Sequence, residues 1–469
     1  MTPTYFILSL GCAMNAADGE RVATVLEEVG YKKATSEKTA DILVAIACSV
    51  RQKAVDRLWG KLQGWKKIKA KRNLTTILTG CVLPKDQKTL AAEFDLYLDV
   101  KNIHKLKDEL ASLPSPIFND LNKKDLTRWQ DDLSVPPLRS DKLRALVPIM
   151  TGCNAFCSYC AVPFTRGRER SRNVADVLNE VEELVMKKNY KEITLLGQII
   201  NKYRVELRPE DEKIIAKWLK KYPPSEMAKQ LLADPIYVEK KQLIFPLLLA
   251  LLDSLPKKWW LRFMSSHPYW FNNMLMEVVA QSEHIPHLFH LPLQAGSNNV
   301  LKSMLRPYTI EQYREAIKKI HSRLPDSALT TDIIVGFCGE TEKDFTESEK
   351  VFKEFGYVMA YIARFSPRQH SAAWKLPDTL TWDEKGEREA SLEKILRKTA
   401  KNHNEKHLGE IMTVLPINHK KTADGYLLGK NCDNVTINFK ADKLPNDFIS
   451  VKIELAEPFG LYGSIVGNF

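Results

Sequence analysis

The pattern of apolar and polar positions in the first part of the chain is typical of strands in some segments and of helices in others. Short apolar runs rich in β-branched residues predict strands, which are expected at 5–10, 41–47 and 75–78. Residues 16–29 show a helical period that stops at Gly30, a residue that commonly ends helices. Strands that alternate with helices predict an α/β domain with a parallel sheet over residues 1–125.

The same alternation returns after a polar, proline-bearing stretch at 126–140, which we interpret as a linker. A charged, helix-prone insertion near 204–242 interrupts the later pattern. The strands and helices expected around it lie at 146–150, 174–188, 192–196, 288–291, 310–323, 332–337 and 343–355. Repeated β/α units of this kind predict a central partial (β/α) barrel at 141–380.

The last part of the chain changes character. Charged residues at 381–402 predict a linker helix, and beyond it short apolar runs are separated by Gly, Asn, Asp and Pro. Strands are expected at 411–415, 435–439 and 450–454. This pattern predicts a small all-β barrel at 403–469, so the predicted fold class is α/β with an all-β domain at the end.

Two apolar runs bear on contact with a membrane. Residues 5–10 lead to a Gly-Cys pair, but no Lys or Arg precedes them and the residue before the pair is bulky. We therefore expect a buried strand there rather than a lipoprotein signal. Residues 243–252 are too short to span a bilayer, which favours a buried helix. We expect a cytoplasmic protein that does not bind membranes.

Composition narrows the possible classes of protein. The chain of 469 residues is 44% hydrophobic and 27% charged, which excludes a disordered or fibrous protein. Its eight cysteines are too few for a disulfide scaffold, so we expect free or metal-bound thiols. The net charge of +11 suggests an acidic partner, of which nucleic acid is the usual example.

The charge is unevenly distributed along the chain. Residues 1–139 carry +5, residues 401–469 carry none, and the remaining +6 lies between them. Eight basic residues and one acid at 53–72 are interpreted chiefly as a solvated helix face. Four arginines and one glutamate at 166–172 are better placed to contact phosphate or a cofactor.

The neutral terminal module would have to bind RNA through hydrogen bonds and stacking rather than charge. Its candidate stacking residues are Tyr426, Phe439, Phe459 and Tyr462. The alternative is that these aromatic side chains fill the barrel, and we favour it for at least two of them.

The densest chemical signal is a cysteine triplet directly after a predicted strand. Cys153, Cys157 and Cys160 have the spacing Cys-x3-Cys-x2-Cys. Three thiolates on one loop can hold three irons of a 4Fe–4S cluster, and the fourth iron stays open to a substrate or cofactor. A zinc site is the alternative, but no histidine lies between residues 105 and 266 to complete it.

This triplet resembles the hallmark of the radical S-adenosylmethionine (SAM) superfamily, and other motifs are similar to its methylthiotransferase family. The motifs that carry the resemblance are Gly11-Cys12-Ala13-Met14-Asn15, Cys48-Ser49-Val50-Arg51, Gly80-Cys81, 148–172, Leu195-Leu196-Gly197-Gln198, Ser266-His267-Pro268, 291–297 and Gly336-Phe337-Cys338-Gly339-Glu340-Thr341. The closing β segment is similar to the family's TRAM module, so the resemblance covers nearly the whole chain.

The resemblance implies S-adenosylmethionine and two 4Fe–4S clusters as cofactors. The cluster that binds and reductively cleaves S-adenosylmethionine, giving a 5′-deoxyadenosyl radical, would be held by the catalytic Cys153, Cys157 and Cys160. A second cluster, which carries the sulfur to be inserted, would be held by Cys12, Cys48 and Cys81. For any one of these three, a buried core cysteine is the alternative. Further cofactor contacts are expected from Arg172, Gln198, Gly336, Gly339 and Glu340.

Some of the motif residues can also be explained without any contact to a cofactor. A tight β–α connection also explains the glycine-bearing turn at 336–340. His267 is interpreted as a packed histidine at a strand end. Cys338 and Cys432 lack sequence partners and are not expected to be ligands.

Members of the family modify isopentenyladenosine next to the tRNA anticodon, threonylcarbamoyladenosine at the same site, or an aspartate of a ribosomal protein. The residues around Cys48 and the stretch 163–169 are most similar to the first type. The resemblance therefore implies a transferase that methylthiolates carbon 2 of isopentenyladenosine in tRNA. The other two types remain alternatives, and a non-catalytic iron–sulfur RNA-binding protein is the rival from another class.

The chain departs from the family pattern at Ile46-Ala47, at Ile199-Ile200 and at Cys338. The first two departures fall where the substrate face is expected. The implied partners are tRNA and a flavodoxin-type or ferredoxin-type reductant, and we expect a monomer. The sulfur donor stays open.

Overall fold

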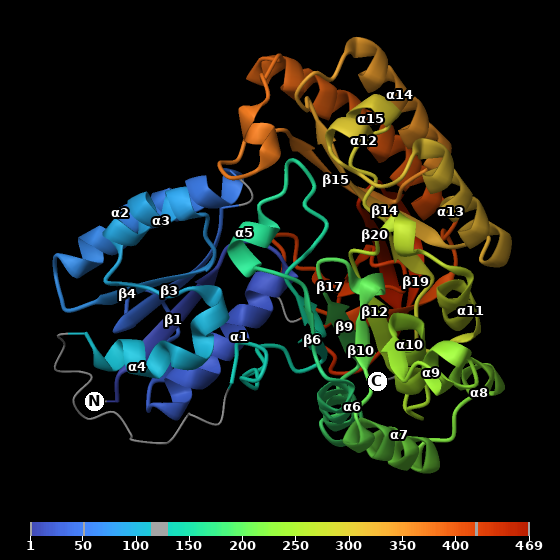
Figure 1. Cartoon of the computed structure of the whole chain (residues 1–469), viewed down its shortest axis with the longest axis horizontal. Coiled ribbons are helices and arrows are strands. Elements are labelled where there is room, and N and C mark those ends of the chain that lie inside the picture. Colours follow the sequence, from blue (N-terminus) through green and yellow to red (C-terminus); the bar gives the residue numbers. More distant parts are fainter. Residues whose placement is uncertain (1, 50–51, 114–129, 418–420, 468–469) are drawn as a thin grey trace. The chain divides into compact units, whose positions relative to one another are not determined.

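The computed structural model describes residues 2–49, 52–113, 130–417 and 421–467 (Figure 1). The chain divides into two compact units, and neither is continuous in sequence. The first unit consists of Met1–Ser140, Met150–Arg170 and Ser366–Trp374, and the second of Asp141–Ile149, Ser171–Phe365 and Lys375–Phe469. The predicted domain boundaries stay predictions, and Val50, Arg51 and the linker residues 126–129 lie outside the described residues.

A parallel five-stranded sheet is the centre of the first unit, in the order β2-β1-β3-β4-β5 (Figure 1). Its strands are β1 (Thr4–Ser9), β2 (Lys32–Lys33), β3 (Ile42–Cys48), β4 (Thr75–Cys81) and β5 (Leu96–Tyr97). The three predicted strands are confirmed, and β4 continues three residues beyond the predicted end.

Helices cover both faces of this sheet, because alternate side chains of β3 point to opposite sides. Ile42, Val44 and Ile46 pack into one core cluster with apolar residues of α1, whereas Leu43 and Ala45 pack into another with residues of α2. The helices of the unit are α1 (Ala13–Glu28), α2 (Gln52–Lys69), α3 (Pro84–Leu90), α4 (Leu106–Ala111) and α5 (Val162–Arg166), with 3-10 turns at Ala91–Glu93 and Val100–Lys105. Short strands β7 (Met150–Thr151) and β8 (Arg170–Ser171) flank the cysteine triplet.

Two parallel three-stranded sheets organise the second unit, in the orders β12-β9-β6 and β13-β14-β15. Their strands are β6 (Arg144–Pro148), β9 (Glu192–Leu196), β12 (Trp260–Phe263), β13 (Leu288–His290), β14 (Ala328–Val335) and β15 (Met359–Arg364). The helices among them are α6 (Val174–Glu182), α11 (Asn273–Gln281), α12 (Asn298–Ser303), α13 (Ile310–Arg323) and α14 (Glu342–Phe355). Parallel strands with helices between them confirm the predicted α/β class.

The insertion near 204–242 is helical, as predicted, and a short antiparallel pair closes its base. That pair, β10 (Arg204–Glu206) and β11 (Gln242–Ile244), encloses α7 (Pro209–Lys221), α8 (Glu226–Leu232) and α9 (Pro235–Val238). The apolar run that follows forms the buried helix α10 (Phe245–Asp253), which begins at a proline-bearing first turn. Among the described residues, no helix is long and apolar enough to cross a membrane.

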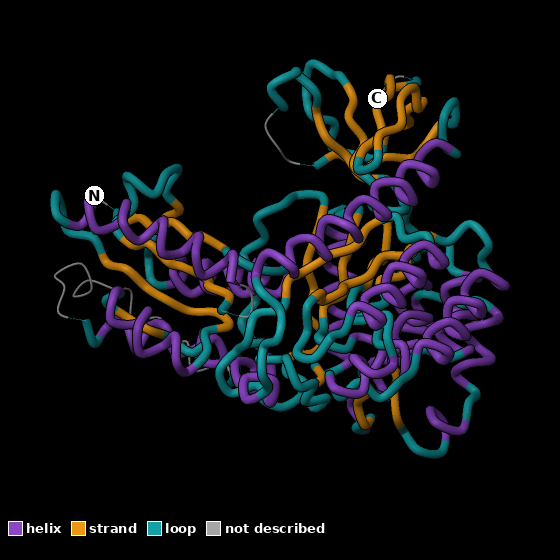
Figure 2. The backbone as a smooth tube through the Cα atoms, turned by 90° about the horizontal axis from the view of Figure 1, so that it is seen from above, coloured by secondary structure: helices purple, strands orange, loops and turns teal. Residues whose placement is uncertain are grey.

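A long helix, α15 (Trp382–Glu405), leads to a closed five-stranded barrel at the end of the chain (Figure 2). The barrel strands are β16 (Ile411–Pro416), β17 (Leu427–Lys430), β18 (Thr436–Phe439), β19 (Ile449–Glu457) and β20 (Gly460–Ile465). The small all-β barrel is therefore confirmed, and two of its strands, β17 and β20, were not expected from the sequence.

Replacement of Gly80 by alanine should destabilise the first unit. Gly80 has a φ of +108°, and a Cβ there would lie 2.3 Å from the carbonyl oxygen of Ala47 on the neighbouring strand. We expect Gly80→Ala to lower the free energy of unfolding by about 2 kcal/mol or more, measured by chemical denaturation. Gly60→Ala is the matched control, since Gly60 lies in α2 with open space around it and the change should be neutral or stabilising. Equal stabilities of the two variants would contradict the close approach of β3 and β4.

Candidate functional site

The thiols of Cys12, Cys48 and Cys81 come to one edge of the first unit's sheet. Cys48 and Cys81 are the last residues of the neighbouring strands β3 and β4, and they are paired in register. Cys12 is the N-cap residue of α1 and lies three residues after Ser9, the last residue of β1. The carboxyl ends of parallel strands meet at one edge, which is where open α/β sheets bind their ligands. The role of the three thiols as cluster ligands stays a prediction.

A buried asparagine holds this edge together. The Asn15 side chain donates a hydrogen bond of 3.0 Å to the carbonyl of Ala47, and its Oδ1 lies 3.3 Å from the Cys12 sulfur. Asn15 has no exposed surface, so its amide fixes the start of α1 against the end of β3. Sequence reasoning treated Asn15 only as part of a motif and did not expect this contact.

A second polar contact fixes the chain after Cys81. The Ser49 hydroxyl donates to the carbonyl of Cys81 at 3.0 Å and accepts from the backbone N–H of Leu83 at 2.8 Å. Both hydrogen bonds are buried, so the Ser49 hydroxyl satisfies two backbone groups that water cannot reach. The residues that directly follow the ends of β3 and β4 are therefore hydrogen-bonded to each other.

The triplet Cys153, Cys157 and Cys160 lies on the loop between β7 and α5. Cys153 and Cys157 are buried and Cys160 is half-buried. The loop is closed by backbone hydrogen bonds from Cys153 to Gly167 (3.2 Å) and from Cys160 to Cys157 (2.9 Å). Such a preformed loop presents three thiols from eight consecutive residues, and this set fits a 4Fe–4S cluster.

One buried arginine connects the two sets of cysteines. The Arg166 guanidinium, 3% exposed, donates from Nη2 to Asp18 on α1 (2.5 Å) and from Nε to the Cys81 sulfur (3.0 Å). Burial raises the pKa of the Cys81 thiol to about 12, and the positive charge of Arg166 acts in the opposite direction. Arg166 therefore stabilises negative charge on one of the proposed cluster ligands.

The arginines of 166–172 were expected to contact phosphate or a cofactor; Arg166 is buried, and the expectation stays a prediction. Two others are ion-paired within the chain: Arg170 with Asp131 and Asp132, and Arg172 with Glu180. The fourth, Arg168, lies over the ring of Phe156 with its guanidinium carbon 4.8 Å from the ring centre.

Polar atoms without partners gather at the carboxyl ends of β9 and β12 in the second unit. Gln198 Oε1, Ser266 Oγ and His267 Nε2 are buried, and no hydrogen-bond partner for them exists among the residues that the structure describes. Burying such groups unpaired costs free energy, so the set fits a polar ligand. Gln198 was predicted to contact the cofactor, whereas the hydroxyl of Ser266 was not singled out.

His267 is a neutral hydrogen-bond donor at this site, because its Nδ1 accepts from the backbone N–H of Tyr269 at 3.2 Å and the proton is therefore on Nε2. Burial, together with the positive charges of Arg306 and Lys202, lowers the pKa of His267 to about 2. Its ring packs against Trp270 and Tyr308, as expected for a packed histidine at a strand end. The Asn201 side chain pairs with the backbone N–H and carbonyl of His267 at 2.8 and 3.0 Å.

The glycine-bearing turn at 336–340 is held by an ion pair. Glu340 Oε2 accepts from the backbone N–H of Gly336 and from Arg388 on α15, both at 2.6 Å, and Glu340 is 3% exposed. Burial raises the pKa of Glu340, while Arg388 opposes the shift. The carboxylate thus has a structural role in the turn. Cofactor contacts from Gly336, Gly339, Glu340 and Arg172 stay predictions.

The basic helix α2 is largely neutralised by neighbouring acids. Three of its lysines form ion pairs within the unit: Lys61 with Glu37, Lys66 with Glu93 and Lys69 with Asp95. These contacts support the interpretation of 53–72 as a solvated helix face.

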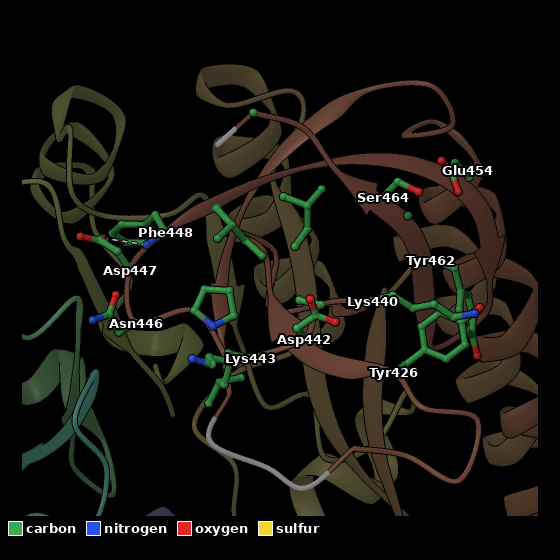
Figure 3. A pocket seen from close by; sticks show the side chains of 17 residues that line it. Tyr426, Lys440, Asp442, Lys443, Asn446, Asp447, Phe448, Glu454, Tyr462 and Ser464 are labelled. Atoms are coloured by element: carbon green, nitrogen blue, oxygen red, sulfur yellow. Dashed lines mark hydrogen bonds between the residues drawn. The ribbon is translucent and has the colours of Figure 1, made fainter. Parts of the chain in front are cut away.

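A pocket of about 1050 Å³ opens on the terminal barrel (Figure 3). Tyr426 and Tyr462 line it with their ring centres 5.4 Å apart, and the Lys440 ammonium lies 5.1 Å from the Tyr426 ring centre. Phe439 is fully buried in the barrel core, so it is one of the aromatic side chains that fill the barrel, as the favoured alternative expects. Phe459 is 38% exposed and lies under the guanidinium of Arg397.

Removing the charge of Arg166 should cost more stability than removing a surface charge. Arg166→Gln leaves Asp18 buried and unpaired, so we expect a loss of about 3–5 kcal/mol in chemical denaturation. Lys61→Gln removes an exposed pair and should cost about 1 kcal/mol or less. The double variant Arg166→Gln/Asp18→Asn should be more stable than the sum of its single changes implies. Additive losses would show that the two side chains are not coupled.

Comparison with known proteins places the chain in a family. Residues 147–351 match the Radical SAM superfamily, and residues 4–99 match the Uncharacterized protein family UPF0004. Three curated relatives carry the name tRNA-2-methylthio-N(6)-dimethylallyladenosine synthase. The one from Desulforamulus reducens is 34% identical over 99% of this chain and 96% of its own length. The one from Staphylococcus aureus is 34% identical over 99% and 85%. The one from Carboxydothermus hydrogenoformans is 33% identical over 99% of both chains. With this identity over its whole length, the chain belongs to the radical SAM family of tRNA-2-methylthio-N(6)-dimethylallyladenosine synthases.

Proposed function

We propose that this chain is a tRNA methylthiotransferase that adds a methylthio group to carbon 2 of isopentenyladenosine next to the anticodon. The observation that carries the proposal is the presence, in one compact unit, of two separate cysteine triplets joined by Arg166. The names and full-length similarity of the relatives support the same activity and the same tRNA substrate. The enzyme uses S-adenosylmethionine and two 4Fe–4S clusters.

The two cysteine triplets would hold clusters with different tasks in the reaction. Cys153, Cys157 and Cys160 would hold the cluster that supplies the electron for cleavage of S-adenosylmethionine. Cys12, Cys48 and Cys81 would hold the cluster that supplies sulfur. The protein's own contribution at the second triplet is electrostatic, since Arg166 donates a hydrogen bond to Cys81 and offsets thiolate charge in a buried setting.

The polar atoms of the second unit would orient S-adenosylmethionine. Neutral His267 can donate a hydrogen bond from Nε2 to the carboxylate of the cofactor without adding a positive charge next to its sulfonium and ammonium groups. Gln198 offers an amide that can both donate and accept. Removal of these buried atoms from water before the cofactor arrives favours its binding.

The departures from the family pattern at Ile46-Ala47 and Ile199-Ile200 are compatible with the proposed activity. Ile46 belongs to the core cluster beneath α1, so the expectation that it touches the substrate face is wrong. Ile199 and Ile200 are also buried, and Asn201 keeps its paired contact with His267. Modification of threonylcarbamoyladenosine or of a ribosomal protein remains the second candidate.

The terminal barrel would bind tRNA by stacking. Its net charge is zero, so affinity must come from specific contacts, and Tyr426, Tyr462 and Lys440 share one pocket. We place the reaction in the cytoplasm, with a monomeric enzyme and a flavodoxin-type or ferredoxin-type electron donor.

Single cysteine replacements should separate the two functions. Cys157→Ala should abolish cleavage of S-adenosylmethionine under dithionite and lower the iron content from about eight to about four per chain. Cys48→Ala should show the same loss of iron but keep cleavage, and it should yield no methylthio product on isopentenylated tRNA. Iron analysis, 5′-deoxyadenosine release and nucleoside mass spectrometry measure these outcomes.

Cys432→Ser serves as the matched control and should retain about eight irons and full product. Unchanged cleavage in Cys157→Ala would refute the radical mechanism. A methylthio product found only on threonylcarbamoyladenosine or on protein would assign the chain to another type of the family.

Replacement of Lys440 should weaken tRNA binding without affecting the cofactors. Lys440→Gln removes one cation from the pocket, so we expect weaker binding of tRNA and a salt dependence reduced by about one ion. S-adenosylmethionine cleavage in the absence of tRNA should be unchanged. Lys452→Gln, on β19 outside the pocket, is the control in a filter-binding titration at several salt concentrations. Identical affinities for the two variants would exclude the pocket as a tRNA contact.

A further inference from the structure

Two histidines and an aspartate converge where α15 meets the terminal barrel. His403 lies on the last turn of α15, His407 lies in the turn that follows, and Asp433 lies between β17 and β18. One ligand atom from each falls within 4.8 Å of the others. None of the three belongs to the cysteine sets or to the polar atoms around Gln198.

Two distances within this group are long for hydrogen bonds and close to the separation of two ligands on one metal ion. His403 Nε2 and His407 Nε2 lie 3.4 and 3.5 Å from the same oxygen, Asp433 Oδ2. Hydrogen bonds between nitrogen and oxygen are shorter, at 2.7–3.2 Å. Ligands on a tetrahedral zinc ion, with bonds of about 2.0–2.1 Å, stand about 3.3–3.4 Å apart. His407 Nε2 is also buried and has no hydrogen-bond partner in the described parts of the chain.

The surroundings orient the ligands as metal sites require. Glu410 Oε2 lies 2.7 Å from Nδ1 of His407, which leaves Nε2 directed at Asp433. A carboxylate on the second ring nitrogen is the usual partner of a metal-bound histidine. The spacing of His403 and His407, four residues apart, places both rings on one side of the chain as it leaves the helix.

The loop that carries Asp433 is also held in place. Arg262 of β12 donates to the carbonyls of Asn431 and Cys432 at 2.7 and 2.8 Å. The Asn431 side chain accepts from the backbone N–H of Val435 at 2.8 Å. Asp433 is therefore fixed by its own loop and does not depend on the histidines for its position.

The charge balance favours a cation at this point. The Asp433 side chain is 10% exposed, so its negative charge is largely removed from water. A divalent ion bound by neutral imidazoles would neutralise this charge.

We propose that His403, His407 and Asp433 form a zinc site that fastens the terminal barrel to α15. Two imidazoles and one carboxylate are a zinc ligand set, and water would take the fourth position. Asn404, between the histidines, already donates to the carbonyls of Glu457 and Pro458 at 2.7 and 3.2 Å. Zinc would add a second tie between the same two elements and would not take part in the reaction at the iron–sulfur sites.

The test is zinc binding by the full-length protein after cluster reconstitution and removal of free metal with a chelator. Equilibrium dialysis against ZnCl₂, followed by metal analysis, should give one more zinc per chain for the unaltered protein than for His403→Gln/His407→Gln. Asp433→Asn should weaken the same binding at least about tenfold. Zinc should raise the Tm of the unaltered protein and leave that of the double variant unchanged.

Cys432→Ser is the matched control, since its sulfur lies 3.6 Å from the other carboxylate oxygen of Asp433 and outside the group of three ligands. It should bind zinc as the unaltered protein does. Circular dichroism of the metal-free variants confirms that they are folded. Equal zinc uptake by the unaltered protein and the double variant would overturn the proposal, whatever the state of the clusters, because all eight cysteines are common to both.

Discussion

A single buried guanidinium links the two proposed sets of cluster ligands in the first unit. Arg166 pairs with Asp18 of α1 and donates to the sulfur of Cys81, while its own loop carries the triplet around Cys157. A buried charge is tolerated only when its partners are in place, because burial of an unpaired ion costs several kcal/mol. The position of the triplet loop against the sheet is thus coupled to the electrostatics of the other set of thiols.

The two candidate sites, the thiols of the first unit and the buried polar atoms of the second, depend on different physical constraints. The thiols of the first unit depend on backbone register, since Cys48 and Cys81 end neighbouring strands and Gly80 permits their close approach. The polar atoms of the second unit depend on burial without partners, as at Gln198 and His267. The first arrangement is held by contacts within the chain, whereas the second contains buried polar atoms that a bound ligand could satisfy.

Local pattern predicted the elements, and the convergence of Cys12, Cys48 and Cys81 followed from the rule that parallel strands end at one edge. Helix 310–323 and strand 192–196 agree with the structure residue for residue. Of the missed strands, β10 and β17 have three and four residues, too few to show a period, whereas β15 and β20 have six residues each and were missed for another reason. The Arg166–Asp18 pair joins residues 148 positions apart, and the His403–Asp433 pair joins elements of different type. No local signal reports such contacts.

The discontinuous first unit has a consequence for synthesis of the chain. Asp18 and Cys81 leave the ribosome well before Arg166, and residues 366–374, whose Ala373 N–H bonds to the carbonyl of Ser158, come later still. At about 5–20 residues per second, the 148 positions between Asp18 and Arg166 take about 7–30 s to translate. During that interval Cys81 and Asp18 are without the buried positive charge that pairs with them in the folded unit.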